Sequence, residues 1–320
     1  MRFSHIIATK GRPDVLGPAL DSSLATLPMG SEVIVVDGDP ARSAEPVVRE
    51  RAERAERNGS DPATVRYLTS PPGLTIQRNR GIDAASGEVV LLTDDDCTLE
   101  PGIFEALASG YADDSLVGAT GRVIQPKEER IGSNQYSRLR RLALGGGLQG
   151  TMTSFGFRRP IVDVDREHDL EFMPGPFMSA RRAAASAVRF DERLTGYALG
   201  EDDDFSFRLS RTGTIRYLPD ATVHHREIGQ PAFDQRMFNR NLVINRAYLR
   251  RKNFGGGLRS RLGFAALLAL LCFHRIINRE WGAMRGLLEG FTELRRSGHA
   301  GGSWVDARSP TDGAGLEQQG

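Results

Sequence analysis

The sequence is poor in cysteine, lysine and long apolar runs. Its two cysteines, Cys97 and Cys272, lie too far apart to suggest a metal motif or a disulfide framework, which favours a reducing compartment. Lysine occurs three times against 39 arginines. The first residues show no charged segment followed by an apolar stretch and a cleavage site, so we expect no secretory signal. The cysteine spacing and the missing signal segment together predict a cytoplasmic protein.

What is present indicates a globular chain with an uneven charge. Hydrophobic residues make up 39% and charged residues 26% of the 320 positions, enough to build a sizeable core. The formal net charge is +1, and we expect no nucleic-acid partner. Residues 226–300 nevertheless contain 14 basic and 5 acidic residues, whereas the remainder is acidic. The sequence therefore predicts an acidic body followed by a basic C-terminal arm.

Strand and helix patterns alternate through the first hundred residues. Short apolar runs that are typical of buried strands occupy residues 3–8, 32–36, 65–68 and 89–93, and helical spacing occupies residues 14–27, 44–58 and 75–85. This alternation predicts an α/β fold with a doubly wound, mostly parallel sheet. A helix over 101–111 and a strand over 117–124 should follow. Residues 125–160 have no clear period, which is typical of a lid or a binding loop.

The run at residues 89–93 ends in three consecutive carboxylates, Asp94, Asp95 and Asp96. Open α/β sheets bind their ligands at the carboxyl ends of parallel strands. Side chains alternate along an extended chain, so we expect Asp94 and Asp96 to point the same way. Mg²⁺ and Mn²⁺ are commonly held by two carboxylates together with phosphate oxygens of a substrate. The triplet therefore predicts a cation clamp for a phosphate or diphosphate substrate.

A second acidic cluster follows Gly200 and comprises Glu201, Asp202, Asp203 and Asp204. The apolar spacing after it predicts a helix that starts here, and acidic side chains are stabilised in the first turn of a helix. Acidic first turns are common for structural reasons alone. A functional interpretation depends on the cation clamp upstream.

Eight short motifs in this order resemble the family 2 glycosyltransferases of the GT-A fold, over about residues 3–226. The motifs are residues 7–13 (Ile-Ala-Thr-Lys-Gly-Arg-Pro), 35–38 (Val-Val-Asp-Gly), 77–81 (Gln-Arg-Asn-Arg-Gly), 94–96 (Asp-Asp-Asp, a DXD motif), 178–182 (Met-Ser-Ala-Arg-Arg), 190–192 (Phe-Asp-Glu), 200–204 (Gly-Glu-Asp-Asp-Asp) and 219–225 (Pro-Asp-Ala-Thr-Val-His-His). The resemblance implies a nucleotide-diphosphate sugar donor and a GT-A type, Rossmann-like sheet.

The resemblance also implies roles for individual residues on the donor side. Residues expected to face the nucleotide or its diphosphate are Thr9, Arg12, Asp37, Arg78, Asn79, Asp94 and Asp95. Asp94, Asp96 and His225 would hold Mn²⁺ or Mg²⁺. A histidine ligand would favour Mn²⁺, because an imidazole nitrogen is a softer ligand than a carboxylate oxygen. For His225 a structural role at a strand end is an equal alternative.

On the acceptor side, Asp202 resembles the general base of the family. Inverting transfer needs a carboxylate that takes the proton of the acceptor hydroxyl while it attacks the anomeric carbon from the face opposite the diphosphate. Glu201 and Asp204 would orient the loop or bind acceptor hydroxyls. The expected acceptor is a glycan or a lipid-linked sugar in bacterial cell-surface polysaccharide or glycolipid synthesis.

Two other functions stay open from the sequence. A sugar-phosphate nucleotidyltransferase also combines an α/β fold with metal-binding carboxylates, but it carries a glycine-rich basic loop after the first strand, where residues 8–13 have one glycine. A non-catalytic nucleotide-sugar-binding subunit of a polysaccharide assembly complex would not need both acidic clusters.

The C-terminal arm, residues 227–300, is expected to be helical. Residues 262–273 are uncharged and apolar, too short a run to span a bilayer, which takes ~20 residues. Arginines flank this run, which suits an interfacial helix on an anionic membrane surface. A helix buried on the catalytic domain or in a homo-oligomer interface is the alternative. Residues 301–320 are expected to be disordered.

Overall fold

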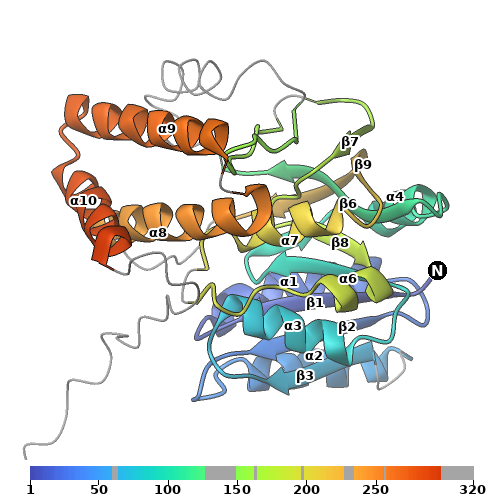
Figure 1. The fold of residues 1–320 in the computed structure, drawn as a ribbon. Helices are drawn as coiled ribbons and strands as arrows, with labels where there is room; N and C mark the ends of the chain where they lie inside the picture. The colour runs from blue at the N-terminus through green and yellow to red at the C-terminus, as the bar shows by residue number, and fades with distance from the viewer. Residues whose placement is uncertain are drawn as a thin grey trace, which may run out of the picture.

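The computed structural model describes residues 1–59, 64–126, 149–161, 164–195, 198–226, 234–255 and 257–296. Most of the loop expected at 125–160 and the whole of the tail expected at 301–320 lie outside these residues. The described chain forms one large mixed sheet with helices on both faces and three C-terminal helices beside it (Figure 1).

The N-terminal half of the sheet is parallel. Strands β1 (Phe3–Thr9), β2 (Glu32–Asp37), β3 (Val65–Thr69) and β4 (Val89–Asp94) pair in the order β3-β2-β1-β4. Each begins and ends within about one residue of the expected run. Strands buried on both faces are nearly continuous apolar runs, which is why the sequence shows them clearly.

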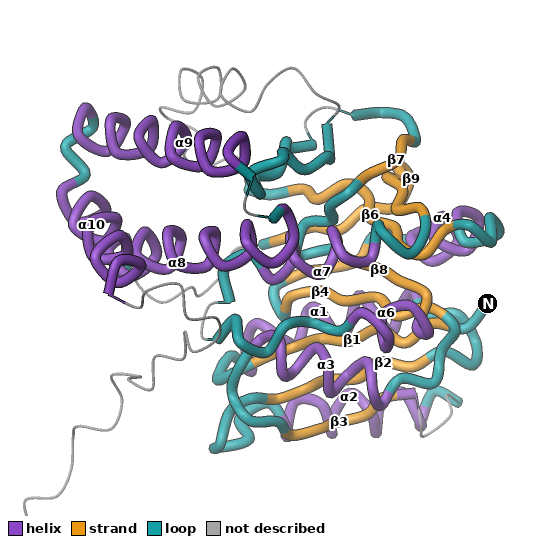
Figure 2. Tube along the Cα trace, in the orientation of Figure 1, coloured by secondary structure: helices purple, strands orange, loops and turns teal. Residues whose placement is uncertain are grey.

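Beyond β4 the sheet becomes mixed and continues as β8-β6-β9-β5, with β7 also on β9 (Figure 2). The bounds are β5 Cys97–Leu99, β6 Leu116–Ile124, β7 His168–Leu170, β8 Met178–Arg181 and β9 Thr214–His225. Strand β8 runs antiparallel to β4, and β9 runs parallel to β6. The α/β GT-A type architecture expected from the sequence is confirmed, with this mixed half added.

Two layers of helices cover the sheet, one on each face. Successive side chains of each strand pack alternately against one layer and the other. Ile7, Val33 and Val35 pack under α1 (Pro13–Thr26) and α2 (Glu45–Arg57). Ile6 and Ile34 lie on the opposite face in the core shared with α3 (Leu74–Ala84), α6 (Arg182–Val188) and α7 (Glu201–Leu209). Helix α4 (Ile103–Gly110) begins two residues later than expected, because Gly102 takes a left-handed conformation, with φ 88°.

Three helices follow the sheet: α8 (Gln235–Phe254), α9 (Leu258–Ile277) and α10 (Trp281–Arg296). Helices α8 and α10 approach so closely that a Cβ on Gly286 would lie 2.1 Å from the carbonyl oxygen of Arg236. The ion pairs Arg236–Glu289 and Arg240–Glu293 join the same two helices. Helix α9 lies along the outside of this group (Figure 1).

The apolar run at 262–273 belongs to a longer helix than its sequence suggested. Helix α9 has 20 residues, and only 22% of its apolar 18-residue stretch is buried. By length and composition alone α9 could cross a membrane, so the expectation that this segment is too short needs correction. The apolar run ends at Phe273, but the helix continues through Ile276 and Ile277.

Candidate active site

Strands β1, β2 and β4 end side by side and place three polar residues at one edge of the sheet. Thr9 pairs with Asp37, and Ala8 pairs with Asp94, in the parallel register of these strands. The side-chain amide of Gln77 donates to the carbonyl oxygens of Thr9 (2.7 Å) and Val36 (2.9 Å), which ties β1 to β2 at this edge. The site expected at the carboxyl ends of the strands therefore has a fixed frame.

Each carboxylate of the Asp triplet has a basic partner. Asp94 accepts from Arg78 at 3.0 Å, Asp95 pairs with Arg12 at 2.8 Å, and Asp96 pairs with the other nitrogen of Arg12 at 3.0 Å. Strand β4 ends at Asp94 and the chain then turns, so the expected alternation of Asp94 and Asp96 does not hold. Arg12 links Asp95 with Asp96, while Asp94 belongs to a separate contact.

The two buried carboxyls of the triplet differ in acidity. Burial raises the pKa of Asp95 to about 6, although the hydroxyl of Thr9, which donates at 2.7 Å, and the charge of Arg12 oppose the rise. Burial also acts to raise the pKa of Asp96, but the imidazole of His225 and the guanidinium of Arg12 outweigh it and hold the pKa below its usual value. Asp96 is therefore the carboxyl of this pair that stays ionised, as a metal ligand must.

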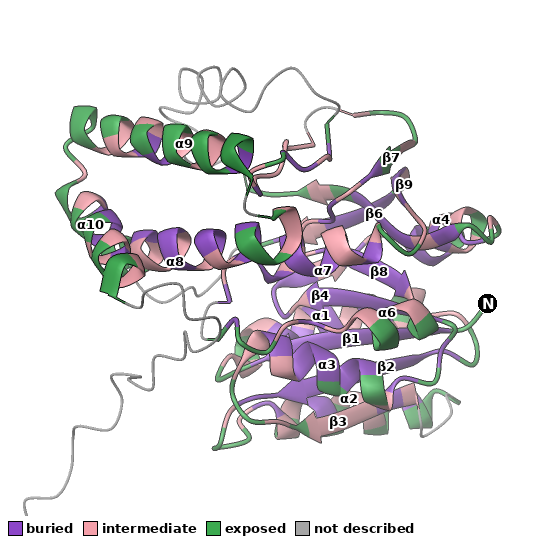
Figure 3. Cartoon of the chain, in the orientation of Figure 1, coloured by how far each residue is buried: buried purple, intermediate pink, exposed green. Residues whose placement is uncertain are grey.

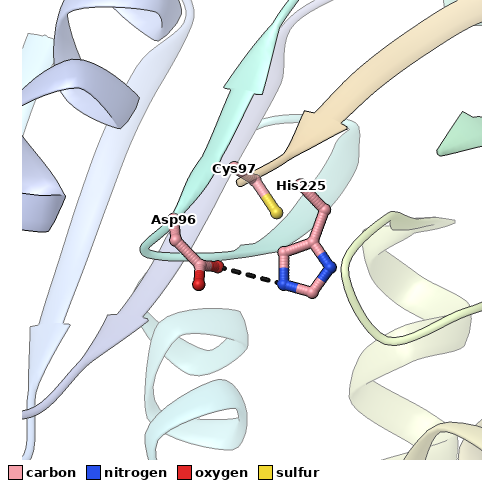
Figure 4. Close-up of side chains that lie close together, drawn as sticks. All are labelled: Asp96, Cys97 and His225. Atoms are coloured by element: carbon pink, nitrogen blue, oxygen red, sulfur yellow. Dashed lines mark ion pairs between the residues drawn. The ribbon is translucent and has the colours of Figure 1, made fainter. Parts of the chain in front are cut away.

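A compact candidate metal cluster consists of Asp96, Cys97 and His225, whose ligand atoms all lie within 4.8 Å of one another (Figure 4). Oδ1 of Asp96 is buried and pairs with Nε2 of His225 at 3.2 Å. A carboxylate oxygen and an imidazole nitrogen this close together can bind one cation between them. Asp94 lies outside this cluster, and its expected role as a metal ligand stays a prediction.

Cys97 lies in this cluster for structural reasons. It is the direct cross-strand partner of His225 in the β5–β9 pair, and its thiol donates to the carbonyl oxygen of Pro176 at 3.5 Å. Burial raises the pKa of the Cys97 thiol, and a sulfur donor suits softer metals than Mn²⁺ or Mg²⁺. The donors that fit Mn²⁺ or Mg²⁺ are therefore Asp96 and His225, with substrate oxygens completing the shell.

Arg78 joins the two acidic motifs. Its guanidinium is 1% exposed and donates to Asp94, to Glu201 and to the carbonyl oxygen of Gly175, each at 3.0 Å. It also lies 5.4 Å from the ring centroid of Phe190. These three contacts use both terminal nitrogens of Arg78, and the expectation that Arg78 also faces the nucleotide stays a prediction. The residue holds the strand end of β4 against the start of α7.

Glu201 is the carboxyl most strongly affected by this arrangement. Burial and the neighbouring charge of Asp202 raise the pKa of Glu201 to about 8, and the charge of Arg78 only partly opposes them. At neutral pH Glu201 is therefore mostly protonated and is a poor base. This leaves Asp202 as the carboxylate of the second motif that is suited to accept a proton.

Asp202 sits beside an arginine that the sequence did not reveal. Oδ2 of Asp202 accepts from Arg158 at 2.9 Å and from the backbone N–H of Gly175 at 3.3 Å, and the Asp202 side chain is 13% exposed. Arg158 lies over the ring of Phe172, 4.8 Å from its centroid. Arg158 comes from the segment without periodicity, so no pattern identified it.

Three other expected residues have structural partners. Asp37 accepts from the backbone N–H groups of Asp39 and Ala44 and from the hydroxyl of Tyr67, and it is fully buried. It therefore orders the loop after β2, and its expected contact with base or ribose stays a prediction.

Asn79 and Asp204 are also held by protein groups. The amide of Asn79 donates to the carbonyl oxygen of Phe190 and to Glu192, and its oxygen accepts from the N–H of Phe190; its expected contact with the nucleotide stays a prediction. Asp204 is 0% exposed and is held by groups from α7 and α8, which fits a role in orienting this segment better than one in binding acceptor hydroxyls. Its partners are Arg208 (2.7 Å), Lys252 (2.9 Å) and Asn253 (2.9 Å).

The chain resembles proteins of known family and structure. The family described as Glycosyl transferase family 2 matches residues 4–188. No curated protein matches the sequence. Similar solved structures include a mannosyltransferase from Pyrobaculum calidifontis in complex with GDP-Man and Mn²⁺, with TM-score 0.54 and 16% identity over 92% of this chain and 87% of that one.

Two further structures share the fold. Residues 1–349 of TarS from S. aureus, in complex with UDP, match with TM-score 0.52 and 16% identity over 86% of this chain and 72% of that one. GalNAc-T7 with UDP, GalNAc and Mn²⁺ matches with TM-score 0.53 and 16% identity over 71% of this chain. The chain spans only 44% of GalNAc-T7 and of the longer TarS structure.

Proposed function

Because the chain belongs to glycosyl transferase family 2 and is thus a glycosyltransferase, we propose that it transfers a sugar, with inversion, from a nucleotide-diphosphate donor to a hydroxyl acceptor. The observation that carries the proposal is the Arg78 bridge, which holds the Asp triplet and the Glu201–Asp202 pair against each other. A single displacement needs a cation side for the leaving diphosphate and a carboxylate on the opposite side for the acceptor.

On the donor side, Asp96 and His225 are the residues that would hold Mn²⁺ or Mg²⁺. When bound, the ion would offset the charge that develops on the departing diphosphate. Arg12 neutralises Asp95 and Asp96 and is half-buried beside them, so it is placed to pair with phosphate oxygens, which arginine can contact with two nitrogens. Thr9 fixes Asp95 in this arrangement.

On the acceptor side, Asp202 receives the proton. The acceptor oxygen forms a bond to the anomeric carbon as the bond from that carbon to the diphosphate breaks, and the acceptor proton passes to the Asp202 carboxylate. Arg158 and the N–H of Gly175 orient Oδ2 of Asp202. An acceptor that reaches Oδ2 has to share this oxygen with Arg158 or displace its guanidinium.

The competing functions fit the site less well. In a nucleotidyltransferase the loop after β1 would be a glycine-rich, basic loop that binds a triphosphate, whereas residues 8–13 contain one glycine. A non-catalytic binding subunit would need no general base, so the acidic motif at residues 201–204 would have no catalytic role in it. We propose a glycan or lipid-linked sugar as the acceptor class and polysaccharide or glycolipid synthesis as the setting.

The decisive experiment compares Asp202→Asn with Glu201→Gln in parallel. Asparagine keeps the size of Asp202 but removes its basicity, so turnover should fall by ~10²-fold or more while donor binding persists. Glu201→Gln resembles the protonated carboxyl already present and should retain most activity. An active Asp202→Asn enzyme together with an inactive Glu201→Gln enzyme would show that the base is misassigned.

Donor identity is tested by thermal shift with UDP and GDP sugars, each with and without Mn²⁺. These are the two nucleotides seen in the similar structures. A donor at 100 times its dissociation constant should raise the free energy of unfolding by ~2.7 kcal/mol. A panel in which no nucleotide sugar stabilises the protein would contradict the proposed function.

A further inference from the structure

Helix α9 presents an apolar stripe to the outside of the molecule. Its most exposed side chains include Leu258 (72%), Leu262 (61%), Phe273 (57%) and Ile277 (61%). Together with Ala265, Ala266, Ala269 and Ile276 they recur at intervals of three and four residues, which places them within ~120° of the helix circumference. Figure 3 shows exposed positions along the whole length of α9.

The opposite side of α9 is already covered by protein. Leu268 and Leu271 are buried against Val243 of α8 and Leu287 of α10. Near the start of α9, Phe264 lies 6.1 Å from Phe157, ring centroid to centroid. The helix is therefore fixed to the body along its inner face, and its outer apolar face needs another cover.

The charges around the stripe indicate what covers it. Arg259 and Arg261 are exposed at one end of α9 and Arg279 is exposed beyond the other, and α9 contains no acidic residue. Exposed tryptophan also occurs here, because Trp281 is 63% exposed. Basic residues and tryptophan that flank an apolar surface are typical of a protein face that lies on anionic lipid.

A second copy of the chain is a poorer cover for the same face. Paired α9 helices would bring Arg259 and Arg261 of one copy near either the same arginines or Arg279 of the other copy. Like charges in contact oppose association, and no acidic residue of α9 offsets them.

Crossing the bilayer is also disfavoured. A spanning α9 would draw α8 and α10, which cover its inner face, into the hydrocarbon together with their ion pairs Arg236–Glu289 and Arg240–Glu293. We propose that the outer face of α9 docks in the plane of an anionic lipid bilayer, with its apolar stripe in the interface and its arginines at the headgroups.

The test is co-sedimentation of the full chain with vesicles of phosphatidylglycerol and phosphatidylcholine or of phosphatidylcholine alone. The protein should sediment with the anionic vesicles and be released by high salt. Leu262→Glu or Phe273→Glu should lower the partition coefficient at least tenfold. Met29→Glu, at a position that is 99% exposed and remote from α9, is the matched control and should change nothing.

Two matched double variants test how much the arginines contribute to vesicle binding. Arg259→Gln with Arg261→Gln should weaken binding about 30-fold, because each basic residue near an anionic surface contributes a factor of about five. Arg49→Gln with Arg57→Gln, on exposed positions of α2, should leave binding unchanged. Thermal melting and the donor-induced thermal shift should be the same in all variants, so a failed docking result is separate from a failure of the proposed function.

The fluorescence of Trp281 tests for direct contact with lipid. In a Trp304→Phe background Trp281 is the sole tryptophan, and brominated phosphatidylglycerol vesicles should quench its fluorescence. Protein that stays in the supernatant, or that sediments equally with neutral vesicles, would overturn the proposal. So would a dimer that Leu262→Glu converts to a monomer, or a membrane fraction released only by detergent.

Discussion

Replacing Arg78 with methionine tests the link between the two acidic motifs most sharply. Methionine keeps much of the length of the side chain but removes every donor to Asp94, Glu201 and Gly175. Removing one partner of a buried ion pair usually costs about 3–5 kcal/mol, because the other charge stays buried. Asp94 is 29% exposed, so water can hydrate its charge. Most of the loss in free energy of unfolding should therefore come from Glu201.

The cost should depend on pH in a defined direction. The pKa of Glu201 is about 8 in the folded protein against 4.5 in the unfolded chain, so the folded state binds this proton more tightly and loses stability as the pH rises from about 4.5 to 8. Without Arg78 the pKa rises further. At pH 6 the variant should lose about 1–2 kcal/mol, the scale of its lost hydrogen bonds. At pH 9 the loss should approach about 3–5 kcal/mol.

Urea unfolding followed by circular dichroism at pH 6 and pH 9 measures both values. The double variant Arg78→Met with Glu201→Gln is the control, because it removes the carboxylate that would be left unpaired. It should recover most of the difference between the two pH values. An Arg78→Met cost below about 1 kcal/mol, or one that is equal at both pH values, would refute the bridge as the organising contact of the site.

Three further predictions concern the metal ligand, the α7–α8 contact and the core. Asp96→Asn should weaken Mn²⁺ binding, measured by titration calorimetry with the nucleotide present, and Met29→Glu should leave it unchanged. Asp204→Asn should lower the free energy of unfolding by about 2–3 kcal/mol, because it removes charged hydrogen bonds, without changing donor affinity; equal destabilisation by Asp220→Asn, at an exposed position, would contradict this. Burial lowers the pKa of His5 from 6.5 to about 3, so the unfolded chain alone takes up this proton and stability should fall as the pH drops below about 6.5, a slope that should flatten in His5→Gln.

The strands that carry the site were predictable because strands buried on both faces are continuous apolar runs in the sequence. The β1, β2 and β4 runs, and the acidic residues that end β2 and β4, follow from sequence alone. Strands β5 and β7, of three residues each, are too short to produce a pattern. The alternation drawn through Asp94, Asp95 and Asp96 failed because no sequence signal marks the last residue of a strand.

The partners of the site residues were beyond sequence reasoning. Asp37 bonds to the N–H of Ala44, and Asn79 bonds to the backbone of Phe190, 111 positions away. Such contacts depend on how the chain folds back, and periodicity holds no information about them. The proximity of His225 to Asp96 was suggested by the resemblance, and the β5–β9 pairing supplies its physical reason.

The acidic start of α7 has a consequence for how the chain can be divided. Asp203 pairs with Arg246, and Asp204 pairs with Lys252, so both buried carboxylates depend on α8, well past the end of the family match at residue 188. A fragment that stops at residue 226 would keep every strand of the sheet yet leave these two charges without their α8 counterions. Arg158 and Arg208 would still pair with these carboxylates, and the smallest piece that also carries both α8 counterions ends after Lys252, near the end of α8.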